Sequence, residues 1–190
     1  MLGSGSARRT VTVYGLGGIG KTQLAIAYAK RHRDDYSAVF WLNAKDETTL
    51  KQGFVTLAER ISREHPYIVY LADAIQSHRL DASIRAVKRW LDQAKNSGWL
   101  IIYDNYDNPA FGGVPPVDID EADGDMNSVS QSYDIRPYFP DTHHGAILMT
   151  TRSAKVKIGR QVALGKLKEL KDSLEILART SNRQDLQSGM

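Results

Sequence analysis

The run GLGGIGKT at residues 15–22 limits what this chain can fold into more than any other segment. It matches the phosphate-loop pattern G-x-x-x-x-G-K-[ST], and it lies between a β-branched run at 10–14 and helix-forming residues at 22–33. Glycines let the chain curl until successive backbone N–H groups face phosphate oxygens, and the helix that follows adds its positive end. The segment therefore predicts a nucleotide-phosphate site on an α/β domain.

Within this segment, residue types predict separate roles. Lys21 supplies a mobile cation for the β- and γ-phosphates, and the Thr22 hydroxyl can ligate Mg²⁺. The residues that we expect to contact the nucleotide here are Gly15, Gly17, Gly18, Ile19, Gly20, Lys21, Thr22 and Gln23.

The loop also satisfies the dinucleotide pattern G-x-G-x-x-G, which is the main alternative for the segment. A dinucleotide site has no use for Lys21. The acid that would bind the ribose, ~20 residues further on, would fall at 47–51, inside a predicted helix. We therefore favour a triphosphate loop over an NAD site.

A second motif is the apolar run WLIIYD at 99–104, which predicts a buried strand ending in an acid, the Walker B form. Asp104 at the tip of that strand is expected to hold Mg²⁺ together with Thr22; the alternative is that Asp104 caps the next turn. Many ATP-hydrolysing P-loop enzymes place a carboxylate base directly after this position, but here the residue is Asn105, whose amide cannot accept a proton. Asp104 and the offset Asp107 are the catalytic candidates, and neither is certain. We expect slow ATP hydrolysis at most.

A third motif, GAILMTTR at 145–152, puts Thr151 and Arg152 at the end of another predicted strand. Arginine can contact a γ-phosphate with two N–H groups at once. We expect Thr151 and Arg152 to sense the nucleotide; the alternative is a solvated end of a strand.

The pattern between these motifs predicts strands that alternate with helices, hence a mainly parallel sheet with helices on both faces. The predicted strands are 10–14, 38–43, 99–103, 145–151 and 161–164, and the predicted helices are 22–33, 50–61, 80–94 and 170–179. The apolar run 67–71 fits either a helical turn or a short strand. Trp41, Trp90 and Trp99 are predicted to pack in the core.

The chain is divided into a flexible Gly/Ser-rich leader at 1–9, a nucleotide-binding domain at 10–180 and a polar tail at 181–190. Residues 105–144 contain most of the prolines and an acidic patch, and lack periodicity. Because a connection of this length is unusual, we expect a long, partly mobile insertion.

Composition excludes several classes of protein. The 190 residues include no cysteine, which rules out disulfides and Cys-ligated metals. No apolar run is long enough to span a bilayer, so no membrane partner is expected. The formal net charge of +3 is too small to argue for a nucleic-acid partner. These features suit a cytoplasmic globular domain.

The motifs together resemble the NB-ARC domain of NOD-like receptors of the fungal type, which are signal-transducing ATPases with numerous domains (STAND). The segments that carry the resemblance are GLGGIGKTQLAIAYA at 15–29, VFWLNA at 39–44, WLIIYDNYDNP at 99–109, YFPDTHHGAILMTTR at 138–152 and VALGKLKELKDSLEIL at 162–177. The resemblance implies a P-loop NTPase fold, a three-layer αβα sandwich with a mostly parallel five-stranded sheet. It places the strand before Arg152 between the P-loop strand and the Walker B strand.

The resemblance also implies a function in innate immunity. ADP holds the resting state, exchange for ATP switches it, and the receptor assembles into a homo-oligomer. Gly18, Gly20, Lys21 and Thr22 would bind phosphates and Mg²⁺, Asp104 would complete the metal site, and Arg152 would read the γ-phosphate.

The family's helical domain and winged-helix domain have no counterpart in the sequence, so we expect neighbouring domains in a longer receptor. Two other functions remain open. One is a P-loop ATPase or kinase with real turnover, and the other is an ATP-dependent module of a transcriptional regulator.

Overall fold

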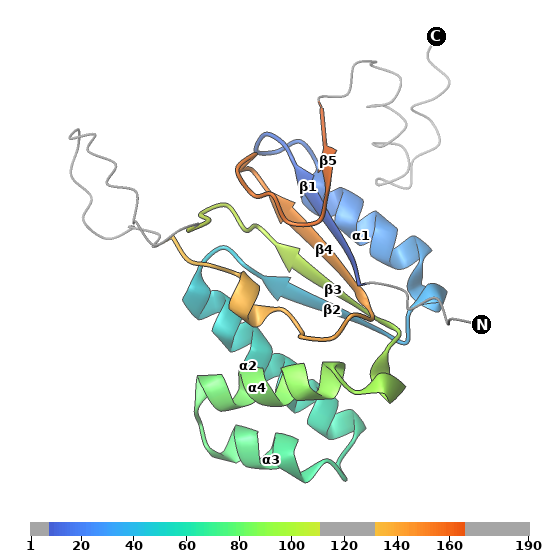
Figure 1. Ribbon diagram of the computed structural model, residues 1–190, viewed down its shortest axis with the longest axis vertical. Helices are drawn as coiled ribbons and strands as arrows, with labels where there is room; N and C mark the ends of the chain where they lie inside the picture. The colour runs from blue at the N-terminus through green and yellow to red at the C-terminus, as the bar shows by residue number, and fades with distance from the viewer. Residues whose placement is uncertain (1–7, 111–131, 166–190) are drawn as a thin grey trace, which may run out of the picture.

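The structure, a computed structural model, describes residues 8–110 and 132–165 (Figure 1). The strands and helices follow one another along the chain in the order that the sequence predicts. The elements are β1 (Arg9–Tyr14), α1 (Lys21–Arg31), β2 (Ala38–Asn43), α2 (Glu47–Glu64), α3 (Val69–Gln76), α4 (Leu80–Leu91), β3 (Trp99–Asp104), β4 (Ala146–Thr151) and β5 (Arg160–Ala163), with 3₁₀ turns at Arg33–Asp35, Ala94–Asn96 and Arg136–Tyr138.

The five strands form one sheet in the order β2-β3-β4-β1-β5, and every neighbouring pair is parallel. This confirms the predicted fold class, including the place of β4 between β1 and β3. Because all five strands run the same way, their carboxyl ends meet at one edge of the sheet, where ligands bind in open α/β folds.

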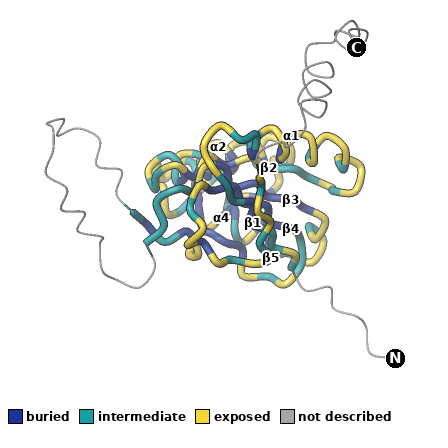
Figure 2. The backbone as a smooth tube through the Cα atoms, turned by 90° about the horizontal axis from the view of Figure 1, so that it is seen from above, coloured by how far each residue is buried: buried dark blue, intermediate teal, exposed yellow. Residues whose placement is uncertain are grey.

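Helices cover both faces of the sheet (Figure 1). Helix α1 lies on one face, over a small cluster that includes Val13, Ala25 and Leu148. Helices α2 and α4 lie on the other face, and α3 packs on α2 and α4 at the outside. Figure 2 shows the buried residues gathered along the central strands.

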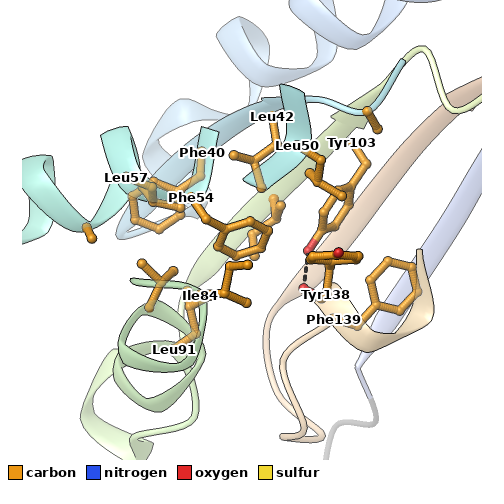
Figure 3. Close-up of a cluster of buried hydrophobic side chains, with 14 of the residues drawn as sticks. Phe40, Leu42, Leu50, Phe54, Leu57, Ile84, Leu91, Tyr103, Tyr138 and Phe139 are labelled. Carbon is orange, nitrogen blue, oxygen red and sulfur yellow. Dashed lines mark hydrogen bonds between the residues drawn. The ribbon is translucent and has the colours of Figure 1, made fainter. Parts of the chain in front are cut away.

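The larger core lies between the sheet and the pair α2 and α4 (Figure 3). Apolar residues recur along α2 at helical spacing, so that one face of the helix is buried: Leu50, Phe54, Leu57, Ala58 and Ile61. Asp46 is the N-cap of α2, and its Oδ1 accepts the N–H of Thr49 at 2.7 Å.

Two details of the sequence interpretation are resolved by the fold. Residues 69–71, part of the ambiguous run, belong to helix α3, in which Leu71 and Ala74 are buried. The prediction that Trp41 packs in the core is wrong, since its side chain is 40% exposed. Strand β2 lies at the edge of the sheet, where Phe40 and Leu42 face the large core and Trp41 points to the other face. Trp90 and Trp99 are buried as predicted.

The segment 105–144, predicted to be a long insertion, is described at its two ends. Both ends contribute buried side chains to the large core, namely Tyr106, Tyr133, Ile135, Tyr138 and Phe139. The two ends also join, because Ala110 N donates to Tyr133 O at 3.0 Å and Tyr133 N donates to Asn108 O at 3.2 Å.

The predictions for most of the leader, for the helix at 170–179 and for the tail at 181–190 concern residues outside the described ranges. Within 8–110 and 132–165, no helix is both long enough and apolar enough to cross a bilayer.

Candidate functional site

Strand register brings the three predicted motifs to one edge of the sheet. Tyr14, the last residue of β1, lies beside Thr151 on β4, and Tyr103 on β3 lies beside Met149 on the same strand. The chain therefore leaves β1, β3 and β4 at adjacent points, and the phosphate loop faces the residues that follow β3 and β4.

The phosphate loop connects β1 directly to α1. Its first residue is fixed to the sheet because Gly15 N donates to Thr151 O at 3.3 Å. Gly18 and Gly20 have φ of +73° and +95°, a left-handed conformation that favours glycine. Gly20 is also the N-cap of α1, and no side chain caps the helix there. The N–H groups at the start of α1 thus remain free to face an anion.

Lys21 lies inside the curve of this loop. Its side chain is largely buried, and Nζ donates to Gly15 O at 2.9 Å and to Leu16 O at 2.8 Å. The loop carbonyls therefore hold the ammonium group next to the glycine backbone.

Opposite the loop, Asp104 accepts hydrogen bonds from two elements. Thr22 Oγ1, on α1, lies 3.1 Å from Oδ1 and 3.2 Å from Oδ2, and Thr150 Oγ1, on β4, donates to Oδ1 in a short bond. The Asp104 side chain is buried at the tip of β3, as its Walker B position predicts. Thr150 also accepts the N–H of Asn105 at 3.0 Å, so it joins the ends of β3 and β4.

The donor set at Thr22 and Asp104 fits a magnesium ion. A hydroxyl and a carboxylate are hard oxygen ligands, and Mg²⁺ commonly takes one or two protein ligands and completes its shell with phosphate and water. Within the described ranges, no group of three or more His, Cys, Asp or Glu side chains is placed to hold a metal ion without such help.

Arg152 lies across the loop from α1 and is held by Asp107. Asp107 Oδ1 accepts the backbone N–H of Arg152 at 2.6 Å, and Oδ2 accepts Nε–H at 2.5 Å. Asp107 is 15% exposed and Arg152 is 65% exposed. Asp107, which the sequence analysis gave as a catalytic candidate, therefore forms an ion pair with Arg152.

The turn that carries Asp107 is fixed by its neighbours. Asn105 has φ of +67°, and Tyr106 N donates to Thr150 O at 3.0 Å. The Tyr106 side chain is fully buried, and its hydroxyl donates to Tyr133 O at 2.7 Å. Burial raises the pKa of Tyr106 to about 12, so the hydroxyl keeps its proton at any pH at which the fold is studied.

These groups surround a pocket of about 330 Å³. The residues that line it are Gly17, Gly18, Ile19, Gly20, Lys21, Thr22, Gln23, Asn105 and Arg152. Eight of these are among the predicted nucleotide-binding residues, and the pocket carries two cationic side chains.

Three residues differ from the expected arrangement. Gly15 lies at the base of the loop, outside the lining. The Thr151 hydroxyl is buried and accepts the N–H of Ser153 at 3.0 Å. Thr150, which was not among the predicted site residues, supplies the hydroxyl that contacts Asp104. The sequence contained a signal for Thr150, which is the first threonine of TTR. Whether Thr150 or Thr151 contacts Asp104, however, depends on which of the two side chains faces β3.

The chain is similar to two known proteins. The chain is 29% identical over 172 residues to a nucleotide-binding leucine-rich repeat (NLR)-like protein of the fungus Hyaloscypha variabilis; the match covers 88% of this chain and 16% of that protein. It superposes on a STAND protein with a tetratricopeptide repeat sensor from Pyrococcus horikoshii with a TM-score of 0.51 and 16% identity, covering 96% of this chain and 25% of that one. No protein-family model matches the chain. The first match confirms the predicted resemblance to NOD-like receptors, and the second confirms the predicted fold.

Proposed function

We propose, from the premise that the chain is an NLR-like domain with the STAND fold, that it binds ADP or ATP with Mg²⁺ and acts as a nucleotide-dependent switch. The switch would belong to a cytoplasmic NOD-like receptor of innate immunity and control its homo-oligomerisation. Because the chain spans 16% of the NLR-like relative and 25% of the STAND protein, neighbouring receptor domains are its expected partners.

One observation carries this proposal. The loop between β1 and α1 curves around Lys21 and lines, together with Arg152, a pocket of about 330 Å³, and the buried Asp104 carboxylate contacts Thr22 of that lining. In the bound state, the loop N–H groups and Lys21 would hold the phosphates. Thr22 and Asp104 would hold Mg²⁺, which neutralises phosphate charge, and Arg152 would contact a terminal phosphate.

The geometry favours binding over rapid turnover. The residue after the Walker B acid is Asn105, and the next carboxylate along the chain, Asp107, is paired with Arg152. A base for water is therefore lacking among the side chains that line the pocket in the described residues. We expect phosphate release far slower than ~1 s⁻¹, the low end of enzyme turnover.

The first test is the thermal unfolding of the chain with ADP, ATP or GTP, each with Mg²⁺. A ligand at 100 times its Kd stabilises a fold by ~2.7 kcal/mol. We expect ADP and ATP to raise the melting temperature, and Lys21→Ala to abolish the rise. The matched control is Lys30→Ala, which removes an exposed lysine from the other end of α1.

Two further arms separate the parts of the proposal. EDTA should reduce the shift in the wild type, and Asp104→Asn should remove this dependence on Mg²⁺. Phosphate release measured in the same samples reports hydrolysis, and rapid release that Lys21→Ala abolishes would favour an ATPase over a switch. If neither ADP nor ATP changes the melting temperature at millimolar concentration, the proposal is wrong for this chain.

A further inference from the structure

The pair formed by Asp107 and Arg152 is more than a surface ion pair. The carboxylate grips the arginine at two points, its backbone N–H at 2.6 Å and its side-chain Nε–H at 2.5 Å. A free surface pair needs no backbone contact. The backbone contact fixes the carboxylate relative to the end of β4, so the side-chain contact holds the arginine in one direction from its own backbone.

The two hydrogen bonds to Asp107 do not involve Nη1 or Nη2 of Arg152. Arginine has five side-chain N–H groups in a planar fork, and Asp107 accepts the one on Nε. Among the residues that the structure describes, neither Nη1 nor Nη2 has a hydrogen-bond partner. One N–H from each of these two nitrogens can pair with two oxygens of a phosphate in a planar, bidentate contact.

The unused end lies against the phosphate loop. A Cβ placed on Gly17 would lie 3.5 Å from Arg152 Cδ and 3.8 Å from Nη1. Arg152 lines the same pocket as Lys21 and the start of α1. The guanidinium is thus close to the loop, yet the Arg152 side chain is 65% exposed, and Asp107 is the acidic partner that holds it.

The backbone around Asp107 is fixed by a hydrogen bond and by a buried neighbour. Its N–H donates to Asn105 O at 2.9 Å within the left-handed turn, and the preceding residue, Tyr106, is buried in the core. The carboxylate is therefore placed by the ends of β3 and β4 and not by a free loop.

We propose that Asp107 is a positioning residue that orients Arg152 toward the terminal phosphate of a nucleoside triphosphate, and so sets the preference of the site for ATP over ADP. This inference rests on the proposed function, since it assigns the residue that tunes that site. Ordering a long side chain before binding removes an entropic cost from the triphosphate complex, whereas ADP has no phosphate that reaches Arg152.

The experiment measures the Kd of ADP and of a non-hydrolysable ATP analogue, each with Mg²⁺, for the wild type and variants. Asp107→Asn keeps the shape and one oxygen acceptor but removes the charge. We expect it to weaken the ATP analogue by roughly tenfold, the scale of one charge-assisted hydrogen bond, and to leave ADP unchanged. Arg152→Ala should act in the same direction. The matched control is Asp141→Asn, which removes an exposed acid paired with Lys88 outside the site.

A double variant separates positioning from a general structural effect. If Asp107 acts through Arg152, Asp107→Asn should have no effect on either ligand in the Arg152→Ala background. The melting temperature without nucleotide reports folding. If Asp107→Asn folds poorly, Arg152→Ala still tests the pair, because the Arg152 side chain is exposed and its removal should not disturb the fold.

Three outcomes overturn the inference. Equal weakening of ADP and the ATP analogue would make Asp107 a structural residue. Tighter binding of the ATP analogue by Asp107→Asn would mean that the carboxylate competes with phosphate for Arg152. No change in either ligand would mean that Asp107 has no part in the site. In each case Lys21→Ala would still abolish binding, so the proposed function would stand, whereas a wild type that binds neither ligand refutes both.

Discussion

The phosphate loop and the strand ends that face it form one site by different means. The loop is made of backbone: glycines in left-handed conformations and carbonyl oxygens that hold Lys21. The strand ends are made of side chains, which join β3 to β4 through Thr150 and are anchored in the core by Tyr106. A short sequence can specify the phosphate loop by itself. The contacts between the strand ends depend on how segments that are distant in the sequence meet.

This difference has a consequence for mutations. Changes at the strand ends should lower the stability of the fold, because their side chains are buried and bonded. Truncation of an exposed side chain in the loop, such as Leu16, should leave stability nearly unaltered, since the carbonyl oxygens and glycine conformations that shape the loop belong to its backbone. The following three variants test the contrast by chemical unfolding, from the largest expected effect to the smallest.

Tyr106→Ala should destabilise the fold by ~3–5 kcal/mol, the cost of truncating a buried aromatic residue. The ring packs edge-to-face on Tyr133 with 5.2 Å between centroids, and its removal leaves a cavity behind the site. The matched control, Tyr106→Phe, keeps the ring and should lose ~1 kcal/mol with its hydroxyl bonds. A loss below ~1 kcal/mol for the alanine variant would show that the strand ends are not anchored as described.

Thr150→Val should cost ~1–3 kcal/mol, because it keeps the shape but leaves the Asn105 N–H without its acceptor and removes one of the donors to Asp104. Thr56→Val, at an exposed position of α2, is the control and should change stability by less than ~0.5 kcal/mol. Equal effects at the two threonines would break the contrast between buried and exposed hydroxyls.

Leu16→Ala should have the smallest effect, within ~0.5 kcal/mol. The side chain is 63% exposed, and the carbonyl of Leu16, which accepts from Lys21, is unaffected by the change. Nucleotide binding should also persist. A large loss of either stability or binding would mean that the loop depends on this side chain and not only on its backbone.

The sequence predicted the loop and the sheet because both follow from local patterns. The motif specifies glycines, a lysine and a hydroxyl at fixed spacing. The five β-branched or apolar runs, with helical segments after the first and the second, favour a parallel sheet. Asp104 and Arg152 were also placed at strand ends, since Asp104 directly follows an apolar run and Arg152 closes the predicted strand 145–151.

The contacts between the strand ends could not be predicted in this way. Whether Thr150 or Thr151 faces Asp104 depends on the register of β4, and a shift of one residue exchanges the two. Asp107 and Arg152 are 45 residues apart, and nothing in their spacing indicates that they pair. Trp41 was assigned to the core from its apolar neighbours, but strand β2 lies at an edge where one face is only partly covered.

The two hydrogen bonds that join Ala110 and Asn108 to Tyr133 have a practical meaning for engineering. They hold residues 108–110 beside Tyr133, so the positions of these two described ends do not depend on the length of the sequence between them. Loop closure costs only ~0.6 kcal/mol for each doubling of length. This point is therefore a natural place to graft a fluorescent reporter, and relatives can diverge in length there without disturbing the pocket.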